Sequence, residues 1–252
     1  MKNKVRNLLI EFANIHRFLM RFLKEVVSPP FEIKEIIRQC YEIGWRSLPL
    51  ISVTGFIVGF VFTKQSRPSL EEFGATSWLP SLISIAIIRA LAPLLTALIA
   101  SGKVGSQIGA ELSSMNVTEQ IDAMEVSGTN PFKFLIVSRV WATTIGIPIL
   151  CFYTAGIGLL GGYLSIASKD DVSFLSFFTQ VFEAIAYKDI FAMVFRAVVF
   201  GFTIGAVSSY CGYFSSKGTE GVGKAANSAV VASMFIVFIE EILIVQILAA
   251  FT

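Results

Sequence analysis

One stretch of the sequence has the residue types and spacing of a nucleotide-binding loop. The octet GTEGVGKA, residues 218–225, has glycines at its first and sixth positions and a lysine directly after the second of them. In a nucleotide-binding loop such glycines let the backbone wrap around the phosphates, and the lysine binds the outer phosphates. The motif also needs a Ser or Thr directly after the lysine to bind Mg²⁺, but this sequence has an alanine there. An uncharged run (197–216) also lies upstream, where the motif needs a buried strand. We therefore interpret the octet as a Gly-rich turn between two membrane-spanning helices.

Three charged residues stand inside long apolar runs: Arg89, Glu240 and Glu241. A charge within a membrane is costly and commonly functional. An arginine there can bind a lipid phosphate through two parallel hydrogen bonds, or it can pair with a carboxylate. Both interpretations of Arg89 stay open, with Glu240 or Glu241 as the expected ion-pair partner. The two glutamates are adjacent, so on a helix they point about 100° apart and cannot act as a facing pair.

The composition indicates an integral membrane protein. Hydrophobic residues make up 54% of the chain and charged residues 15%, and the mean hydropathy is +0.72. The net charge of +2, without a basic stripe that carries interleaved aromatics, gives no indication of nucleic-acid binding. Cys40, Cys151 and Cys211 are scattered and odd in number, and His16 is alone, so neither a disulfide framework nor a metal site is indicated.

Uncharged or nearly uncharged runs predict five membrane-spanning helices. They cover residues 47–63, 73–102, 140–168, 197–216 and 225–252. The first run is short for a full crossing, so tilt or local thinning of the bilayer would have to accommodate it. We expect an all-α integral membrane protein.

The first 27 residues predict a helix that lies in the membrane interface. Apolar residues recur at helical spacing and basic residues occupy the other faces. A signal peptide is the rival interpretation, but Glu11, His16 and Arg17 interrupt any apolar core. The SPP tripeptide at 28–30 then breaks the helix, and a second segment from Glu32 leads into the first span. Basic residues are concentrated in residues 1–46, which predicts a cytoplasmic N-terminus and, after five crossings, a C-terminus outside.

The long inner loop predicts a short amphipathic helix at about 111–127. Asn116 with Glu119 three residues later is typical of an N-cap, and Gly128 followed by Pro131 is typical of a helix end. The segment carries only acidic charges, at Glu111, Glu119, Asp122 and Glu125. An anionic inner leaflet attracts basic residues, so this helix should face a protein. A solvated acidic loop is the alternative.

Several long segments resemble a known family. They are LAPLLTALIASGKVGSQIGAELSSMNVTEQIDAMEVSGTNP (91–131), SRVWA (138–142) and KGTEGVGKAANSAVV (217–231), with RQCYEIGWRSLPL (38–50) as a lead-in. These segments are similar to the permease subunits of Mla-type phospholipid ABC transporters, the MlaE/YrbE family. In that family the Gly-rich segment is an inner turn before the last span, and a separate chain binds ATP.

The resemblance implies a single permease domain over 1–252, with interfacial and elbow helices in 1–46 and a five-span bundle in 47–252. It implies a homodimer in the bacterial inner membrane, two cytoplasmic ABC ATPases and a periplasmic ring of MCE-domain proteins; a small cytoplasmic STAS-domain subunit is a further candidate partner. The chain itself would be non-catalytic and without a cofactor. Phospholipid would move between the inner membrane and the ring, in support of outer-membrane lipid asymmetry.

The resemblance also assigns candidate residues. The acidic inner helix becomes the coupling helix, with Glu111, Glu119, Asp122 and Glu125 as candidates for docking to the ATPase. Candidates for contact with the lipid are Arg89, Phe56, Phe60 and Glu240. In the family an acid usually follows the arginine, whereas Ala90 stands here, so we expect Arg89 to be freer to meet a lipid phosphate.

Two other function classes remain open on the residues alone. A proton-coupled secondary transporter would use Glu240 or Glu241, although five spans give no obvious inverted repeat. A membrane scaffold without transport of its own is the third class.

Overall fold

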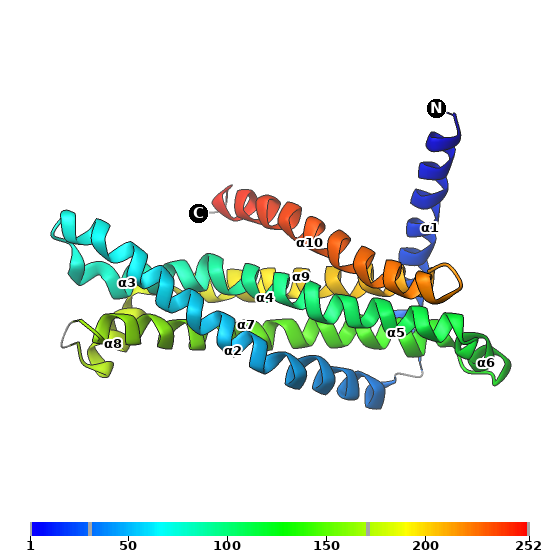
Figure 1. Ribbon diagram of the computed structural model, residues 1–252, viewed down its shortest axis with the longest axis horizontal. Coiled ribbons are helices and arrows are strands. Elements are labelled where there is room, and N and C mark those ends of the chain that lie inside the picture. Colours follow the sequence, from blue (N-terminus) through cyan, green and yellow to red (C-terminus); the bar gives the residue numbers. More distant parts are fainter. Residues whose placement is uncertain (1, 30–31, 170–171, 251–252) are drawn as a thin grey trace.

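The computed structural model describes residues 2–29, 32–169 and 172–250, and every regular element in these ranges is a helix (Figure 1). Five helical segments are long and apolar enough to cross a membrane. They are Ile33–Glu72, Thr76–Val117, Phe132–Ala167, Tyr187–Tyr213 and Thr219–Ala250. The predicted all-α membrane protein with five spans is thereby confirmed.

Helix α1 (Lys2–Val27) stands apart from the bundle and leaves one end of it at a steep angle (Figure 1). Phe18 and Phe22 are buried against Phe132 and its neighbours, and they attach α1 to the bundle. Other apolar side chains of α1, such as Leu19 and Leu23, stay exposed. A helix of this kind fits the predicted position in the membrane interface. The side chains of residues 2–12, including Glu11, lie outside the described part.

Helix α2 (Ile33–Glu72) corrects the expected length of the first span. The run at 47–63 was too short to cross easily, but one helix of 40 residues continues through it from the lead-in to the expected outer connection. The helix continues past Lys64, which ended the run, and within this extension Arg67 and Glu71 pair one turn apart, with 2.6 Å between Nε and Oε1.

The second span is one continuous helical rod made of several pieces. After the short turn η1 (Thr76–Trp78) come α3 (Leu79–Ala86), α4 (Ala92–Ala100) and α5 (Ser106–Val117). Between them lie two wider π-helical turns, η2 (Ile87–Leu91) and η3 (Ser101–Gly105). Arg89, the one charged residue of the predicted run 73–102, lies in η2, where the helix is irregular.

The acidic inner helix differs from the predicted one. Residues 111–127 are divided between α5 and the short helix α6 (Gln120–Val126), with Glu119 in the left-handed conformation at φ 58° between them. Asn116 is therefore not an N-cap: it lies inside α5, and its amide donates to the carbonyl of Ser215. The predicted end is correct, because Gly128 adopts φ 80° directly after α6.

The third and fourth spans begin earlier than their apolar runs. The third consists of the π-helical turn η4 (Phe132–Val137) and α7 (Ser138–Ala167), and the fourth is α9 (Tyr187–Tyr213). Between them the structure places a helix, α8 (Phe174–Ala184), where the sequence indicated only a connection. Ser173 caps this helix, since its hydroxyl accepts from the N–H of Ser176.

The opening octet lies at the start of the last span, α10 (Thr219–Ala250). Gly218 has φ 106° and makes the turn out of α9, and the residues after it are helical. Lys224 pairs with Glu220 one turn earlier, with 2.7 Å between Nζ and Oε1. The octet thus forms a turn followed by the first residues of a helix, which agrees with the predicted Gly-rich turn between two spans.

Contacts between helices hold the bundle together, and the most extensive joins two spans that are not consecutive in the sequence, α2 and α7. Helix α2 packs chiefly against α7, α7 against α9, and α10 against α9 and α5. Glycines allow the closest approach: a Cβ on Gly59 would overlap the backbone of Gly158, and a Cβ on Gly161 would overlap the carbonyl of Phe56. The α2–α7 contact is therefore made directly between backbones.

Candidate functional site

A pocket of about 600 Å³ lies between η2, the start of α9 and the end of α10. Its lining residues are Arg89, Ala186, Tyr187, Lys188, Asp189, Phe191, Ala192, Arg196, Leu248 and Ala249. The lining combines cationic groups with apolar and aromatic side chains. A pocket of this composition can hold a molecule that has a charged part and an apolar part.

Arg89 forms a two-pronged ion pair with Asp189 at this pocket. Its Nε lies 2.7 Å from Oδ1, and its Nη2 lies 3.1 Å from Oδ2. Asp189 also accepts from the backbone N–H of Ala186, so the same carboxylate caps the start of α9. The Asp189 side chain is 11% exposed, whereas that of Arg89 is 53% exposed. The pair therefore fixes the guanidinium on one edge and leaves much of it open to the pocket.

The partner of Arg89 corrects the sequence prediction. Glu240 or Glu241 was expected, but both carboxylates are used elsewhere. Arg196 binds Glu241, with 2.8 Å between Nη1 and Oε1, and the hydroxyl of Thr203 donates to Glu240. The expectation that Ala90 leaves Arg89 without an acid is also wrong, because α9 supplies that acid as Asp189.

A second pocket, of about 840 Å³, is almost wholly apolar and lies between the end of α2 and α3. Its lining residues are Phe62, Leu70, Ala75, Ser77, Trp78, Ser81, Leu82, Ile85 and Ala86. Phe56 and Phe60 are half-buried on α2, six and two residues before Phe62, with ring centroids 6.2 Å apart, and they do not line either of these two pockets. Their contact with a lipid stays a prediction.

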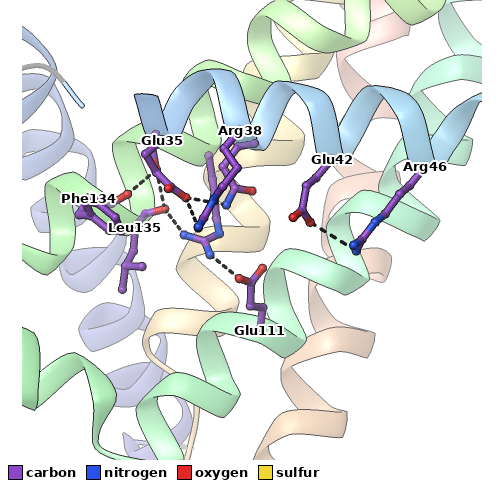
Figure 2. A network of polar contacts seen from close by, with 10 residues as sticks. Glu35, Arg38, Glu42, Arg46, Glu111, Phe134 and Leu135 are labelled. Carbon is purple, nitrogen blue, oxygen red and sulfur yellow. Dashed lines mark hydrogen bonds and ion pairs between the residues drawn. The ribbon is translucent and has the colours of Figure 1, made fainter. Parts of the chain in front are cut away.

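The four acidic residues assigned to coupling lie in two different environments at the α5–α6 end. Glu119, Asp122 and Glu125 are exposed, and α6 is anchored by buried Ile121. Glu111 instead pairs with Arg139, with 2.9 Å between Oε1 and Nη2 (Figure 2). Three of the four acids are thus available to a partner protein, and their role in docking stays a prediction.

Arg139 is the centre of a buried polar contact between α5 and α7. It is 1% exposed, and it donates to the carbonyl of Leu135 at 2.8 Å as well as to Glu111. In Figure 2 Glu35 of α2 lies beside this contact and accepts from Arg38 and from Gln39, each at 2.8 Å. A buried arginine needs such partners, so Glu111 serves first of all to neutralise Arg139.

Sequence reasoning missed Asp189 and Arg196. The rule that spans are uncharged began the fourth run at Ala197, which left both residues outside the predicted span, with Asp189 at the end of the expected outer connection (169–189). A signal was present: the two residues stand seven apart around an apolar run, which is about two helical turns, so both belong to one helix face. The structure brings them together around Arg89.

Comparison with known proteins agrees with these features. The model of the family described as Permease MlaE matches residues 36–247. The chain belongs to the MlaE permease family. It is 37% identical over 225 residues to a probable ABC transporter permease protein of Rickettsia prowazekii, covering 89% of this chain and 87% of that protein.

The chain is also similar to proteins of Synechocystis and of Pyropia yezoensis. A probable ABC transporter permease protein of Synechocystis is 33% identical over 208 residues, covering 82% of this chain and 79% of that protein. Another, from Pyropia yezoensis, is 30% identical over 230 residues, covering 91% of this chain and 88% of that protein. The similarity thus extends over nearly the whole bundle.

Proposed function

We propose that this MlaE-family permease is the membrane subunit of an ABC transporter and that it moves phospholipid. The observation that carries the proposal is the pocket at Arg89. A guanidinium that is 53% exposed lies beside Phe191 and Leu248, which gives a phosphate and an acyl chain neighbouring places to bind. The names of the relatives, probable ABC transporter permease proteins, support the transporter class.

The proposal includes the partners that the family resemblance implies. Two copies of the chain sit in the bacterial inner membrane with the N-terminus inside and the C-terminus outside. ATP is bound and hydrolysed on a separate ATPase, and an MCE-domain protein receives or delivers lipid at the outer side. The exposed acids Glu119, Asp122 and Glu125 at one end of the bundle support the ATPase contact, because no basic residue stands in residues 111–127. A STAS-domain subunit is a further partner to test.

The family membership favours this function over a proton-coupled secondary transporter. Such a transporter would need Glu240 or Glu241 as a titrating group. In the structure Glu241 neutralises Arg196, and Glu240 accepts from Thr203. Both carboxylates thus already have a structural role.

Purification of the native assembly from the membrane tests the proposal. The expected result is co-purification of an ATPase and an MCE-domain protein, with phospholipid bound at a fixed ratio. The double variant Arg89→Met with Asp189→Asn removes the guanidinium without stranding its carboxylate, and it should lower the phospholipid content. Purification of the chain with neither partner would overturn the transporter assignment, and an unchanged phospholipid content would remove the Arg89 pocket from it.

A further inference from the structure

The backbone carbonyl of Arg89 lacks the donor that an α-helix would supply. In an α-helix this carbonyl accepts from the N–H four residues on. That residue is Pro93, whose ring nitrogen carries no hydrogen. The chain widens into η2 at the same place, and the N–H of Ala92 bonds the carbonyl of Ile87, five residues back.

Arg196 supplies the missing donor from the neighbouring helix. Its Nη1 donates to the carbonyl of Arg89 and also lies 2.8 Å from Oε1 of Glu241. The Arg196 side chain is 9% exposed, so its charge is held inside the bundle and neutralised by Glu241. One cation thus joins η2, α9 and α10.

Helix α9 therefore holds Arg89 at two points. Asp189 binds the guanidinium, and Arg196, two turns later on α9, binds the main chain. With both contacts made, the free edge of the guanidinium faces the pocket. Loss of the main-chain contact would remove the donor that Arg196 gives to the Arg89 carbonyl, at a position where Pro93 rules out the regular helical bond.

We propose that Arg196 is a positioning residue for the contact between Arg89 and a phosphate-bearing lipid headgroup. It replaces the hydrogen bond that Pro93 removes, and through Glu241 it makes the placement of Arg89 depend on α10. Leu248 and Ala249 of α10 line the same pocket, so a movement of α10 would change the pocket and the arginine together. The headgroup part of this inference rests on the proposed function.

The competing view is that Arg196 only neutralises Glu241. Pro93 separates the two views, because Pro93→Ala restores the backbone N–H and gives the Arg89 carbonyl its helical donor. If Arg196 positions Arg89, it becomes dispensable in the Pro93→Ala protein. If Arg196 only balances the charge of Glu241, Pro93→Ala makes no difference to the effect of losing it.

The first measurement is hydrogen–deuterium exchange of residues 87–94 in nanodiscs of phosphatidylethanolamine and phosphatidylglycerol. Every Arg196→Met protein also carries Glu241→Gln, so that neither member of the pair is left alone, and the references are the wild-type protein and Pro93→Ala. We expect Arg196→Met to speed exchange about tenfold with Pro93 present, and much less in the Pro93→Ala background. Lys224→Met is the control: it removes an exposed cation at the other end of α10 from the pocket and should leave exchange unchanged. An equal acceleration in both backgrounds, or none in either, would overturn the inference.

The second measurement is the phospholipid content of the same proteins after purification. Arg196→Met with Glu241→Gln should lower it as far as Arg89→Met with Asp189→Asn does, and Pro93→Ala should restore it. If Arg89→Met with Asp189→Asn leaves the phospholipid content unchanged, the proposed headgroup site is wrong, even if the exchange of residues 87–94 depends on Pro93 as expected. If the Arg89 variant lowers the content but exchange shows no dependence on Pro93, the positioning role fails and the headgroup site stands.

Discussion

At the scale of single residues, three arginines inside the spans are each paired with a carboxylate. Arg89 pairs with Asp189, Arg196 with Glu241 and Arg139 with Glu111. Removing one member of a buried pair leaves the other charge without compensation, and that costs far more than removing both.

The pair of Arg89 and Asp189 gives a direct prediction about stability. Arg89→Ala leaves a carboxylate that is 11% exposed without its partner, and it should destabilise the protein by about 3 kcal/mol. Asp189→Asn should cost less, because the Arg89 side chain is half-exposed and can be solvated. The double variant should recover most of the loss. Thermal unfolding of the three proteins in one detergent checks this order, and equal melting temperatures would contradict it.

The sequence pointed to Arg89 but not to its surroundings. A charged residue in an apolar run is visible by inspection, whereas its partner lies 100 residues later at the start of another helix. Asp189 looked like a residue of an outer loop, because only the folded bundle shows that α9 begins before it.

At the scale of elements, the central contact is the glycine-lined crossing of α2 and α7. Backbones that approach this closely are stabilised by dispersion attraction between them, and they leave no room for a side chain. The sequence shows glycines four apart at Gly55 and Gly59, and the structure shows that Gly158 of α7 faces them, while Gly161 meets the backbone of Phe56 and Phe60.

Gly161→Ala should loosen this crossing, because its new methyl group would overlap the carbonyl of Phe56. We expect a loss of about 1–3 kcal/mol, the usual cost of overpacking. Gly156→Ala is the matched control on the same helix, since a Cβ there has no atom within 4 Å. Thermal stability of the two proteins should differ clearly, and similar melting temperatures would show that the crossing can relax.

Helix α6 gives the prediction that concerns a partner. Glu119→Lys combined with Asp122→Lys reverses two exposed charges without touching buried Ile121, so the chain should still fold and insert. Assembly with the ATPase should weaken, as measured by pull-down and by stimulated ATP hydrolysis. Glu72→Lys, at an exposed site on the far end of α2, is the control. Unchanged assembly would mean that these acids are only solvated.

The helical type of the elements and the number of spans could be predicted from the sequence, but the ends of the elements could not. The predicted runs were bounded by charged residues, whereas α2 and α9 continue past such residues, whose charges pair within the helix or across the bundle. Helix α8 was missed because it is short and follows a break at Ser173 rather than a long apolar run.

At the scale of the whole molecule, the prediction concerns nucleotide. The purified chain should neither bind nor hydrolyse ATP, because the residues from Thr219 to Lys224 that would wrap the phosphates are already wound into α10. Titration with a fluorescent ATP analogue measures this. Nucleotide affinity that Lys224→Ala abolishes would contradict the prediction.

The preference of α2 for α7 has a consequence for synthesis. The first span leaves the ribosome long before its main partner, and the helix that follows it in the chain packs against it much less. At about 5–20 residues per second, the wait until Ala167 has been made is on the order of ten seconds. During that time the glycine face of α2, with Gly55 and Gly59, lies open to lipid or to whatever protein assists its insertion, and other nascent helices with small residues could occupy it first.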